Sequence, residues 1–325
     1  MKHPKKTPTD ASSNKEIRKS VPEKPLISRG KGSSKDDRVE KKSLEASGPQ
    51  EVAVPLETKD RRKLNNARRL SRFIDEVRKK YGNDLESKDP KERQRAVALY
   101  FIDMFVFRSG WKKKRGDESE SAGCCLLRKK HMKLVKNANQ KFLVEFNFSG
   151  KDAIPYHKVV EVEKIVYLNL KAFQKGKSDE DYVFNLIEAN FVNAYLKSIM
   201  DGLTSRVFRT YHASQMMEKK LAEFTRADDS ESRKIKSFKK ANNEVAIILN
   251  HKRQVAEKCT KKKEKRKTKD EEFETGLETS ILYYIDPRIV VSWCRKWNIP
   301  VEKVYSEFQL EKFDWAMSAK ADFKF

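Results

Sequence analysis

The spacing of hydrophobic residues separates a polar N-terminal stretch from a longer region with helical and strand periodicity. Residues 1–58 contain no Phe, Tyr or Trp and are rich in Lys, Ser, Pro and Glu. Such a segment buries too little apolar surface to offset the entropy of ordering it. We therefore predict a disordered basic tail over 1–58 and folded structure from Lys59 onwards.

Two helices are predicted at the start of the folded region. Apolar residues three and four positions apart indicate a helix over Asn66–Tyr81, with an apolar face of Leu70, Phe73, Ile74 and Val77. A second helix runs from about Lys91 to Arg108. Gly110 ends this helix, so that Arg108 is expected in its last turn.

A β-hairpin is predicted next. Residues alternate with the period of a half-buried strand at Phe142, Val144, Phe146 and Phe148. The run from Ser149 to Asp152 breaks this strand, and a return strand begins over 154–156. Lys151 is therefore expected at the tip of the hairpin. Upstream of it, we interpret Cys124 and Cys125 as buried strand residues.

The pattern that follows is mostly helical. Helical spacing starts at about Val160, and Ser178 with Asp181 resembles a capping box that opens the helix carrying Leu186, Ile187, Phe191 and Tyr195. Another helix begins near Arg206, and a further one ends at His251.

A run of Lys, Arg and Glu then separates this region from a compact, aromatic C-terminal segment. We predict a core over 59–252, a short charged linker over 253–275 and a C-terminal domain over 276–325. Asp286 and Pro287 open a helix in that domain, because Pro is favoured at the first helical position. Together these patterns predict an α+β protein that is predominantly α-helical.

The charge balance indicates an anionic partner. The chain of 325 residues has 72 Lys and Arg against 48 Asp and Glu, which gives a net charge of +24. This charge favours DNA or RNA first and an anionic membrane surface second. No apolar run approaches the roughly 18 residues of a membrane-spanning helix. Four cysteines in a chain of this size indicate a reducing compartment.

Sequence motifs for metal and nucleotide chemistry are missing. The five histidines are scattered, and the adjacent Cys124 and Cys125 cannot form a CxxC knuckle, which argues against zinc. The sequence has no GxxxxGK[ST] loop and no carboxylate cluster that would hold magnesium. If such a chain cuts a phosphodiester, it must do so with cationic side chains.

Several motifs, in order along residues 59–325, resemble those of the eukaryotic type IB DNA topoisomerases. They are Arg93–Asp103, Gly123–Cys125, Gly150–Asp152, Gly202–Thr204, Val207–Tyr211, Asn250–His251 and Thr279–Arg288. Members of that family relax supercoiled DNA through a 3′-phosphotyrosine, without ATP or an essential metal. The resemblance implies a DNA breaking-rejoining fold with a small three-stranded antiparallel sheet. It also implies duplex DNA as the partner, no membrane, no cofactor and a nuclear location.

The resemblance assigns roles to individual residues. Tyr284 matches the nucleophile, in the register fixed by the Asp-Pro-Arg that follows. Arg108 and Arg209 match the arginines that stabilise the phosphorane, and His251 matches the histidine that donates to a phosphate oxygen. Lys151 matches the lysine proposed as general acid for the 5′-oxygen. DNA contacts are implied for Asp152, Asn250 and Thr279.

Each of the five catalytic candidates also has a structural explanation, which the sequence leaves open. Arg108 would complement a helix dipole, and Lys151 would be an ordinary turn lysine. Arg209 would be a surface phosphate clamp, His251 a helix cap, and Tyr284 a packed aromatic residue.

The chain also departs from the family pattern. Tyr283 stands where the family often has Asn, and the charged linker is shorter than the family's coiled coil. The family's N-terminal lobe has no match here, which suggests a truncated product, a fragment, one part of an enzyme whose lobe a separate chain supplies, or a non-catalytic DNA-binding remnant. A tyrosine recombinase is a further alternative. It is disfavoured because Arg209 and His251 lie far apart in the sequence rather than on one helix.

Overall fold

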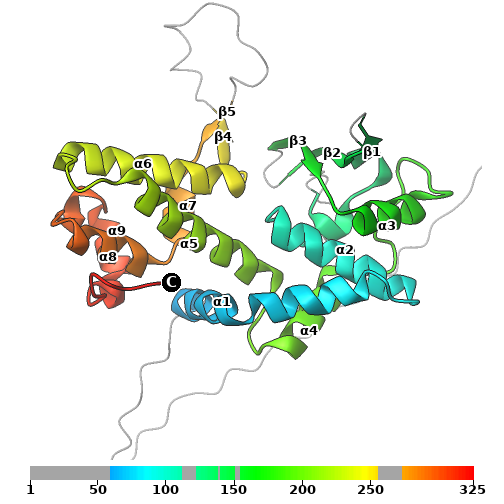
Figure 1. The fold of residues 1–325 in the computed structure, drawn as a ribbon, viewed down its shortest axis with the longest axis horizontal. Coiled ribbons are helices and arrows are strands. Elements are labelled where there is room, and N and C mark those ends of the chain that lie inside the picture. The colour runs from blue at the N-terminus through cyan, green and yellow to red at the C-terminus, as the bar shows by residue number, and fades with distance from the viewer. Residues whose placement is uncertain (1–58, 112–121, 138–139, 151–153, 255–272) are drawn as a thin grey trace, which may run out of the picture. The chain divides into compact units, whose positions relative to one another are not determined.

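The computed structural model describes residues 59–111, 122–137, 140–150, 154–254 and 273–325. Within these ranges the chain is predominantly helical and contains a three-stranded antiparallel sheet, which confirms the predicted class (Figure 1). The predicted tail over 1–58 lies outside the described residues. No helix in the ranges given above is long and apolar enough to cross a membrane.

The first helix, α1 (Lys59–Asp84), confirms the helix predicted over Asn66–Tyr81 and extends it at both ends. Its buried face repeats every three or four residues, through Leu64, Ala67, Leu70, Ile74, Val77 and Tyr81. Phe73 differs from the prediction, because its side chain is exposed at the edge of this face.

The second helix, α2 (Pro90–Met104), begins with a cap in which the Asp89 carboxylate accepts a hydrogen bond from the Lys91 N–H. It ends earlier than predicted, because Val106 adopts a φ of 57°, which a helix cannot contain. A β-branched residue rarely adopts this left-handed conformation. The prediction that Arg108 lies in the last helical turn is therefore wrong, and Arg108 does not complement the dipole of α2.

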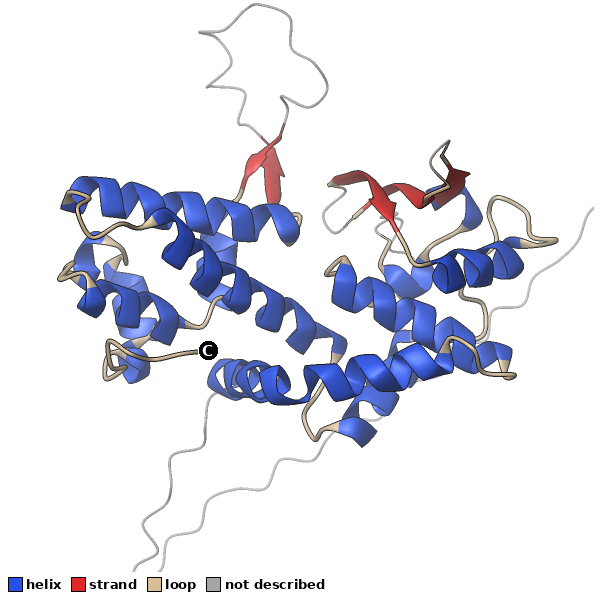
Figure 2. Cartoon of the chain, in the orientation of Figure 1, coloured by secondary structure: helices blue, strands red, loops and turns tan. Residues whose placement is uncertain are grey.

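The sheet is a meander of β1 (Met132–Lys136), β2 (Phe142–Ser149) and β3 (Pro155–Glu161), drawn as arrows in Figure 2. Strands β2 and β3 pair antiparallel from Leu143–Glu161 to Ser149–Pro155, which confirms the predicted hairpin. Lys151, predicted at its tip, and the neighbouring Asp152 lie outside the described residues.

Two local predictions are wrong. Cys124 and Cys125 are buried, but they lie in a 3₁₀ turn (Cys124–Leu126) whose backbone is bonded to the segment after α2 rather than to a strand ladder. Ser178 and Asp181 do not open a helix, because the Asp181 carboxylate accepts from the Ser178 N–H at 2.7 Å and the two residues close a turn.

The helices on either side of that turn are α3 (Lys164–Gln174) and α4 (Ala189–Ile199). Helical spacing predicted from Val160 therefore begins a few residues too early, since Val160 still pairs with Val144 in the sheet. The predicted apolar residues Leu186 and Ile187 lie before α4 rather than in it.

The remaining elements follow in order. They are α5 (Ser205–Phe224), α6 (Glu231–Ile248), β4 (Lys252–Gln254), β5 (Phe273–Thr275), α7 (Leu277–Tyr283), α8 (Pro287–Lys296) and α9 (Glu307–Lys312). Helix α8 starts at the predicted Asp286–Pro287 cap. Strands β4 and β5 pair where the predicted linker begins and ends, and residues 255–272 between them lie outside the described residues.

Buried hydrophobic residues form two clusters. The first joins α1–α4 and the sheet to the start of α5, and the second joins the rest of α5 to α6–α9. The segment after α2 crosses between them, because Val106 belongs to the second cluster and Phe107 to the first. Helix α5 and this short segment therefore form the seam at which the candidate site lies.

Candidate active site

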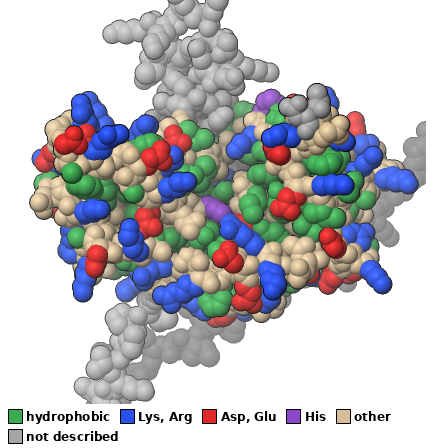
Figure 3. Space-filling view, in the orientation of Figure 1, with side chains coloured by type: hydrophobic (Ala, Val, Ile, Leu, Met, Phe, Trp, Pro, Cys, Tyr) green, Lys and Arg blue, Asp and Glu red, His purple; other side chains and the backbone are tan. Residues whose placement is uncertain are grey.

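A cleft of about 940 Å³ opens at this seam. Segments far apart in the sequence line it, among them the chain after α2, the end of β2, the start of α5, the end of α6, and α7. The cleft brings together the predicted site residues that the structure describes, namely Arg108, Arg209, Asn250, His251, Thr279 and Tyr284. Lys and Arg side chains are spread over the face of the molecule drawn in Figure 3.

Arg209 is the most deeply buried cation of the site, with 4% of its surface exposed. Its guanidinium donates hydrogen bonds to the carbonyls of Val106 and Leu249. Both carbonyls lie at left-handed turns, since Val106 has a φ of 57° and Asn250, which follows Leu249, has a φ of 50°. Within the described residues the Nε of Arg209 has no hydrogen-bond partner. A surface clamp, the structural explanation left open by the sequence, does not fit so buried a side chain.

His251 follows a left-handed turn that ends α6. Its N–H donates to the Ala246 carbonyl at 2.9 Å while Asn250 occupies the left-handed position, the arrangement of a Schellman motif. The backbone of His251 thus caps the helix while its ring enters the cleft. The Nδ1 atom lies 2.9 Å from the Ser280 hydroxyl, and Nε2 lies 3.5 Å from Arg209.

The Tyr284 side chain is 7% exposed and packs among cations. Its ring centroid lies 5.2 Å from the Arg209 guanidinium, 5.2 Å from the His251 ring and 5.8 Å from the Lys63 Nζ. Burial acts to raise the pKa of the phenol, but Arg209 and Arg108 outweigh it, so the pKa lies below its ordinary value. A larger fraction of the Tyr284 phenol is therefore ionised at neutral pH than of a free tyrosine.

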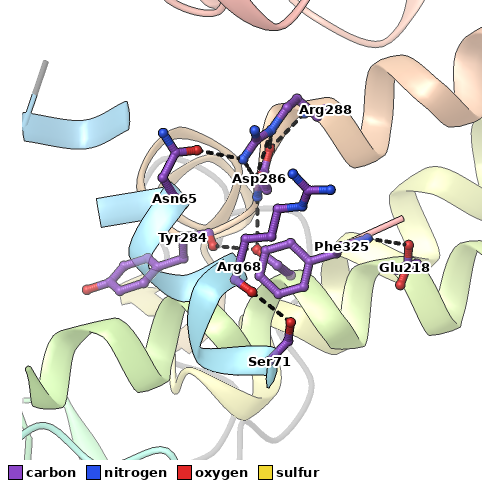
Figure 4. Close-up of polar contacts among 9 residues, drawn as sticks. Asn65, Arg68, Ser71, Glu218, Tyr284, Asp286, Arg288 and Phe325 are labelled. Carbon is purple, nitrogen blue, oxygen red and sulfur yellow. Dashed lines mark hydrogen bonds and ion pairs between the residues drawn. The ribbon is translucent and has the colours of Figure 1, made fainter. Parts of the chain in front are cut away.

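The Asp-Pro-Arg sequence after Tyr284 holds its backbone in place (Figure 4). The Ser214 hydroxyl donates to the Tyr284 carbonyl at 3.3 Å and accepts from the Asp286 N–H at 3.0 Å. Arg288 pairs with the buried Asp286 at 2.6 Å and donates to Asn65 of α1 at 3.0 Å. In Figure 4 the Tyr284 ring points away from this ion pair. These contacts therefore position the backbone of Tyr284 without using its phenol oxygen.

Arg108 lies half-buried at the edge of the cleft, and its carbonyl accepts from the Cys124 N–H at 2.7 Å. Burial, with a further contribution from Arg108, lowers the pKa of Arg209 to about 10. Arg209 therefore remains charged at neutral pH. Two like charges held this close cost free energy, which an anion bound between them would recover.

Sequence reasoning missed two further cations at the site. Arg206, exposed on α5, adds to the positive charge that lowers the pKa of Tyr284. It lies one helical turn before Arg209, a spacing that could have identified it. Lys63 of α1 donates to the Tyr283 carbonyl at 2.6 Å across 220 residues of sequence, and no local pattern signals this contact.

The other predictions for the site divide between described and undescribed residues. Asn250 and Thr279 line the cleft, where Thr279 is exposed. Gly150, the last described residue before Lys151, lines it as well. Within the part of the chain that the structure describes, no group of His, Cys, Asp and Glu could hold a metal ion.

This arrangement suits attack of a phenolate on an anionic phosphate, with forked arginine donors beside the developing charge. Fold and site together therefore define a predominantly helical protein whose buried tyrosine lies among cations, a kind of site suited to chemistry on a phosphodiester. Comparison with known sequences narrows the class. The chain belongs to the eukaryotic DNA topoisomerase I family: residues 53–280 match the family model of the eukaryotic DNA topoisomerase I catalytic core, and 256–325 match that of the C-terminal topoisomerase domain. The predicted resemblance is confirmed.

Individual relatives agree with this family assignment. DNA topoisomerase 1 of Homo sapiens is 37% identical over 82% of this chain and 43% of its own length. DNA topoisomerase 1 of Caenorhabditis elegans is 38% identical over 80% of this chain and 39% of its own length. A relative named DNA topoisomerase I, mitochondrial, from Homo sapiens, is 38% identical over 81% of this chain and 54% of its own length. The chain thus spans about half the length of the curated relatives it matches, or somewhat less.

Proposed function

We propose that the chain carries the ATP-independent activity of a type IB topoisomerase, which relaxes supercoiled duplex DNA by transient cleavage of one strand. The observation that supports this most is the buried Tyr284 phenol, whose pKa Arg209 and Arg108 lower despite its burial. A tyrosine held only for packing would not need the charges of two arginines beside it in a cleft.

In the proposed reaction the Tyr284 oxygen attacks a backbone phosphorus. A 3′-phosphotyrosine forms, the bond to the 5′-oxygen breaks, and that oxygen takes up a proton to leave as a hydroxyl. Attack by the same hydroxyl reverses the step and reseals the strand. The covalent bond retains the energy of the phosphodiester, so the cycle needs no nucleotide.

The roles proposed for individual residues are those that the family resemblance implies. Arg209 and Arg108 would bind the non-bridging oxygens, and the unpartnered Nε of Arg209 offers a buried donor for one of them. His251, whose Nε2 lies 3.5 Å from Arg209, would donate to the same phosphate. Lys151, outside the described residues, would protonate the leaving 5′-oxygen from the hairpin whose end lines the cleft. Asp152, Asn250 and Thr279 would contact flanking DNA.

The proposal extends to the organisation of the protein. We infer a catalytic core over 59–252, a linker over 253–275 and a C-terminal domain over 276–325 that carries the nucleophile. Because the chain matches under half of the length of human DNA topoisomerase 1, a separate chain that supplies the unmatched lobe is a proposed partner. The proposed location is the nucleus.

The decisive experiment is relaxation of a supercoiled plasmid by the chain in EDTA without ATP, alone and with the N-terminal lobe of a relative supplied separately. We expect relaxation in at least one of these mixtures. A strict need for ATP or a divalent metal would contradict the proposal. Binding of the plasmid without relaxation in either mixture would instead indicate the non-catalytic remnant.

A further inference from the structure

Two large aromatic side chains stand exposed in the cleft that buries the candidate nucleophile. Trp111 is 58% exposed and Tyr283 is 43% exposed, and both line this cleft. Trp111 lies three residues after Arg108, and Tyr283 directly precedes Tyr284. Each aromatic residue therefore sits on a segment that also carries a charged or nucleophilic group of the site.

The backbone beneath each ring is held firmly. The residues before Trp111 are tied to the next segment, because the Cys124 and Cys125 N–H groups donate to the carbonyls of Arg108 and Ser109 at 2.7 and 2.8 Å. Gly110 has a φ of 81° and packs so closely on Gly123 that a Cβ atom would lie 2.7 Å from its Cα. These contacts fix the position of Trp111 at the cleft while leaving its indole in solvent.

Tyr283 is held in a similar way. Its carbonyl accepts a hydrogen bond from Lys63 at 2.6 Å, and the Lys312 Nζ lies 5.4 Å from its ring centroid. Among the described residues no aromatic ring stacks on Tyr283 or on Trp111. Two ordered backbone positions thus present aromatic side chains that the folded chain leaves partly exposed, with Lys312 over the ring of Tyr283.

The surroundings of these rings identify the occupant. The cleft carries Arg108, Arg206 and Arg209, in a chain of net charge +24, so an anionic partner complements it. Aromatic faces beside cations are the composition of surfaces that bind nucleic acids by combining base stacking with phosphate contacts. In an intact duplex the base faces are stacked on one another, whereas a strand break removes the covalent link between two neighbouring bases and so makes it easier to open a base face there.

We propose that Trp111 and Tyr283 form an aromatic clamp, which packs on the base or deoxyribose of the nucleotides flanking the cleaved phosphate and retains the broken strand for resealing. This inference rests on the proposed function. Because the clamp acts on open base faces, it stabilises a nicked duplex more than an intact one. Because its contacts are uncharged, it adds affinity without releasing counterions.

The test compares binding of short intact and nicked duplexes by the wild-type chain and by Trp111→Ala, Tyr283→Ala, Trp111→Phe and Phe308→Ala. Phe308 is the matched control, since it is 60% exposed on α9 and does not line the cleft. We expect Trp111→Ala and Tyr283→Ala each to bind the nicked duplex about fivefold to tenfold more weakly, at the lower end of what one base–aromatic contact contributes. Trp111→Phe should retain part of this affinity, and Phe308→Ala should bind as wild type.

Salt dependence separates aromatic contacts from phosphate contacts. Trp111→Ala should leave the slope of log affinity against log salt unchanged, whereas Arg206→Ala should reduce it by about 0.9. Tryptophan emission gives a direct readout, since nicked duplex should quench the wild-type chain more than Trp111→Phe. Circular dichroism of each variant verifies folding.

The outcomes also separate this inference from the function on which it rests. If the wild-type chain binds and relaxes DNA while both alanine variants match Phe308→Ala on nicked duplex, the clamp is refuted and the proposed function stands. Equal losses on intact and nicked duplexes would also contradict the clamp. If the wild-type chain and Phe308→Ala fail to bind either duplex, the proposed function fails.

Discussion

Replacement of Arg209 by lysine tests whether the cleft needs a forked cation or only a positive charge. The guanidinium donates to the Val106 and Leu249 carbonyls, and its Nε is without a partner among the described residues. A lysine keeps the charge but concentrates it in one ammonium group. It cannot satisfy both buried carbonyls and also reach a phosphate oxygen.

The magnitudes follow from these contacts. Loss of one donor to the phosphorane should slow cleavage by about 10² to 10³ fold. One buried carbonyl left without a donor costs about 1–3 kcal/mol of unfolding free energy. In a folded unit of this size the melting temperature should fall by roughly 2–12 °C. The expected slowing of cleavage is therefore larger than the loss of activity that partial unfolding of the variant below its melting temperature would produce.

The assay is single-turnover cleavage of a duplex from which the released 5′-hydroxyl fragment diffuses away, with thermal melting in parallel. Arg233→Lys is the matched control, because Arg233 is 74% exposed on α6 and pairs only with Asp229 at 3.5 Å in the described chain. We expect Arg233→Lys to cleave and melt as wild type. Cleavage by Arg209→Lys at the wild-type rate would refute the role assigned to the guanidinium fork.

Three further predictions address the nucleophile, the electrostatics and the fold. Tyr284→Phe should abolish DNA-linked protein on denaturing gels while Tyr283→Phe should still form it, and the reverse result would move the nucleophile by one residue. Affinity for unrelated duplexes should fall in parallel as salt is added, because the net charge of +24 drives docking, and an affinity insensitive to salt would contradict this. Burial acts to raise the pKa of Asp103, but hydrogen bonds from His212 and Arg78 outweigh it and lower the pKa. Asp103 therefore contributes stability above its unfolded pKa of about 3.9, and this contribution is lost as pH falls through the lower folded value. Asp103→Asn should lower the free energy of unfolding, measured in urea, by about 3 kcal/mol at pH 7 and by less below pH 4. An equal loss at both pH values would exclude the ionic contribution.

Local patterns predicted most of the elements that surround the site. The alternation in β2 and the Asp286–Pro287 cap are short-range signals, so the hairpin and α8 could be placed from the sequence. The errors also have local causes. The Ser178–Asp181 pair has the residue types of a capping box, yet its reciprocal bonds close a turn, and the sequence does not distinguish these outcomes.

The site itself depends on contacts that local patterns do not encode. The left-handed conformation of Val106 is unfavourable for a β-branched residue and is held by packing in the second hydrophobic cluster. It ends α2 early and turns a carbonyl toward Arg209, more than one hundred residues away in sequence. Lys63 reaches Tyr283 from still further away. The candidate residues were therefore predictable from motif order, whereas the electrostatics that lower the pKa of Tyr284 required the three-dimensional structure.

The most direct test of the account is the chemical identity of the protein–DNA bond. The chain is incubated with a nicked duplex, stopped with detergent and digested, and the DNA-linked peptide is identified by mass spectrometry. The account predicts a single peptide in which the Tyr284 oxygen carries the 3′-phosphate of the cleaved strand, with a free 5′-hydroxyl on the other fragment. Attachment through another residue or to a 5′-phosphate, or active relaxation with no linked peptide, would contradict it.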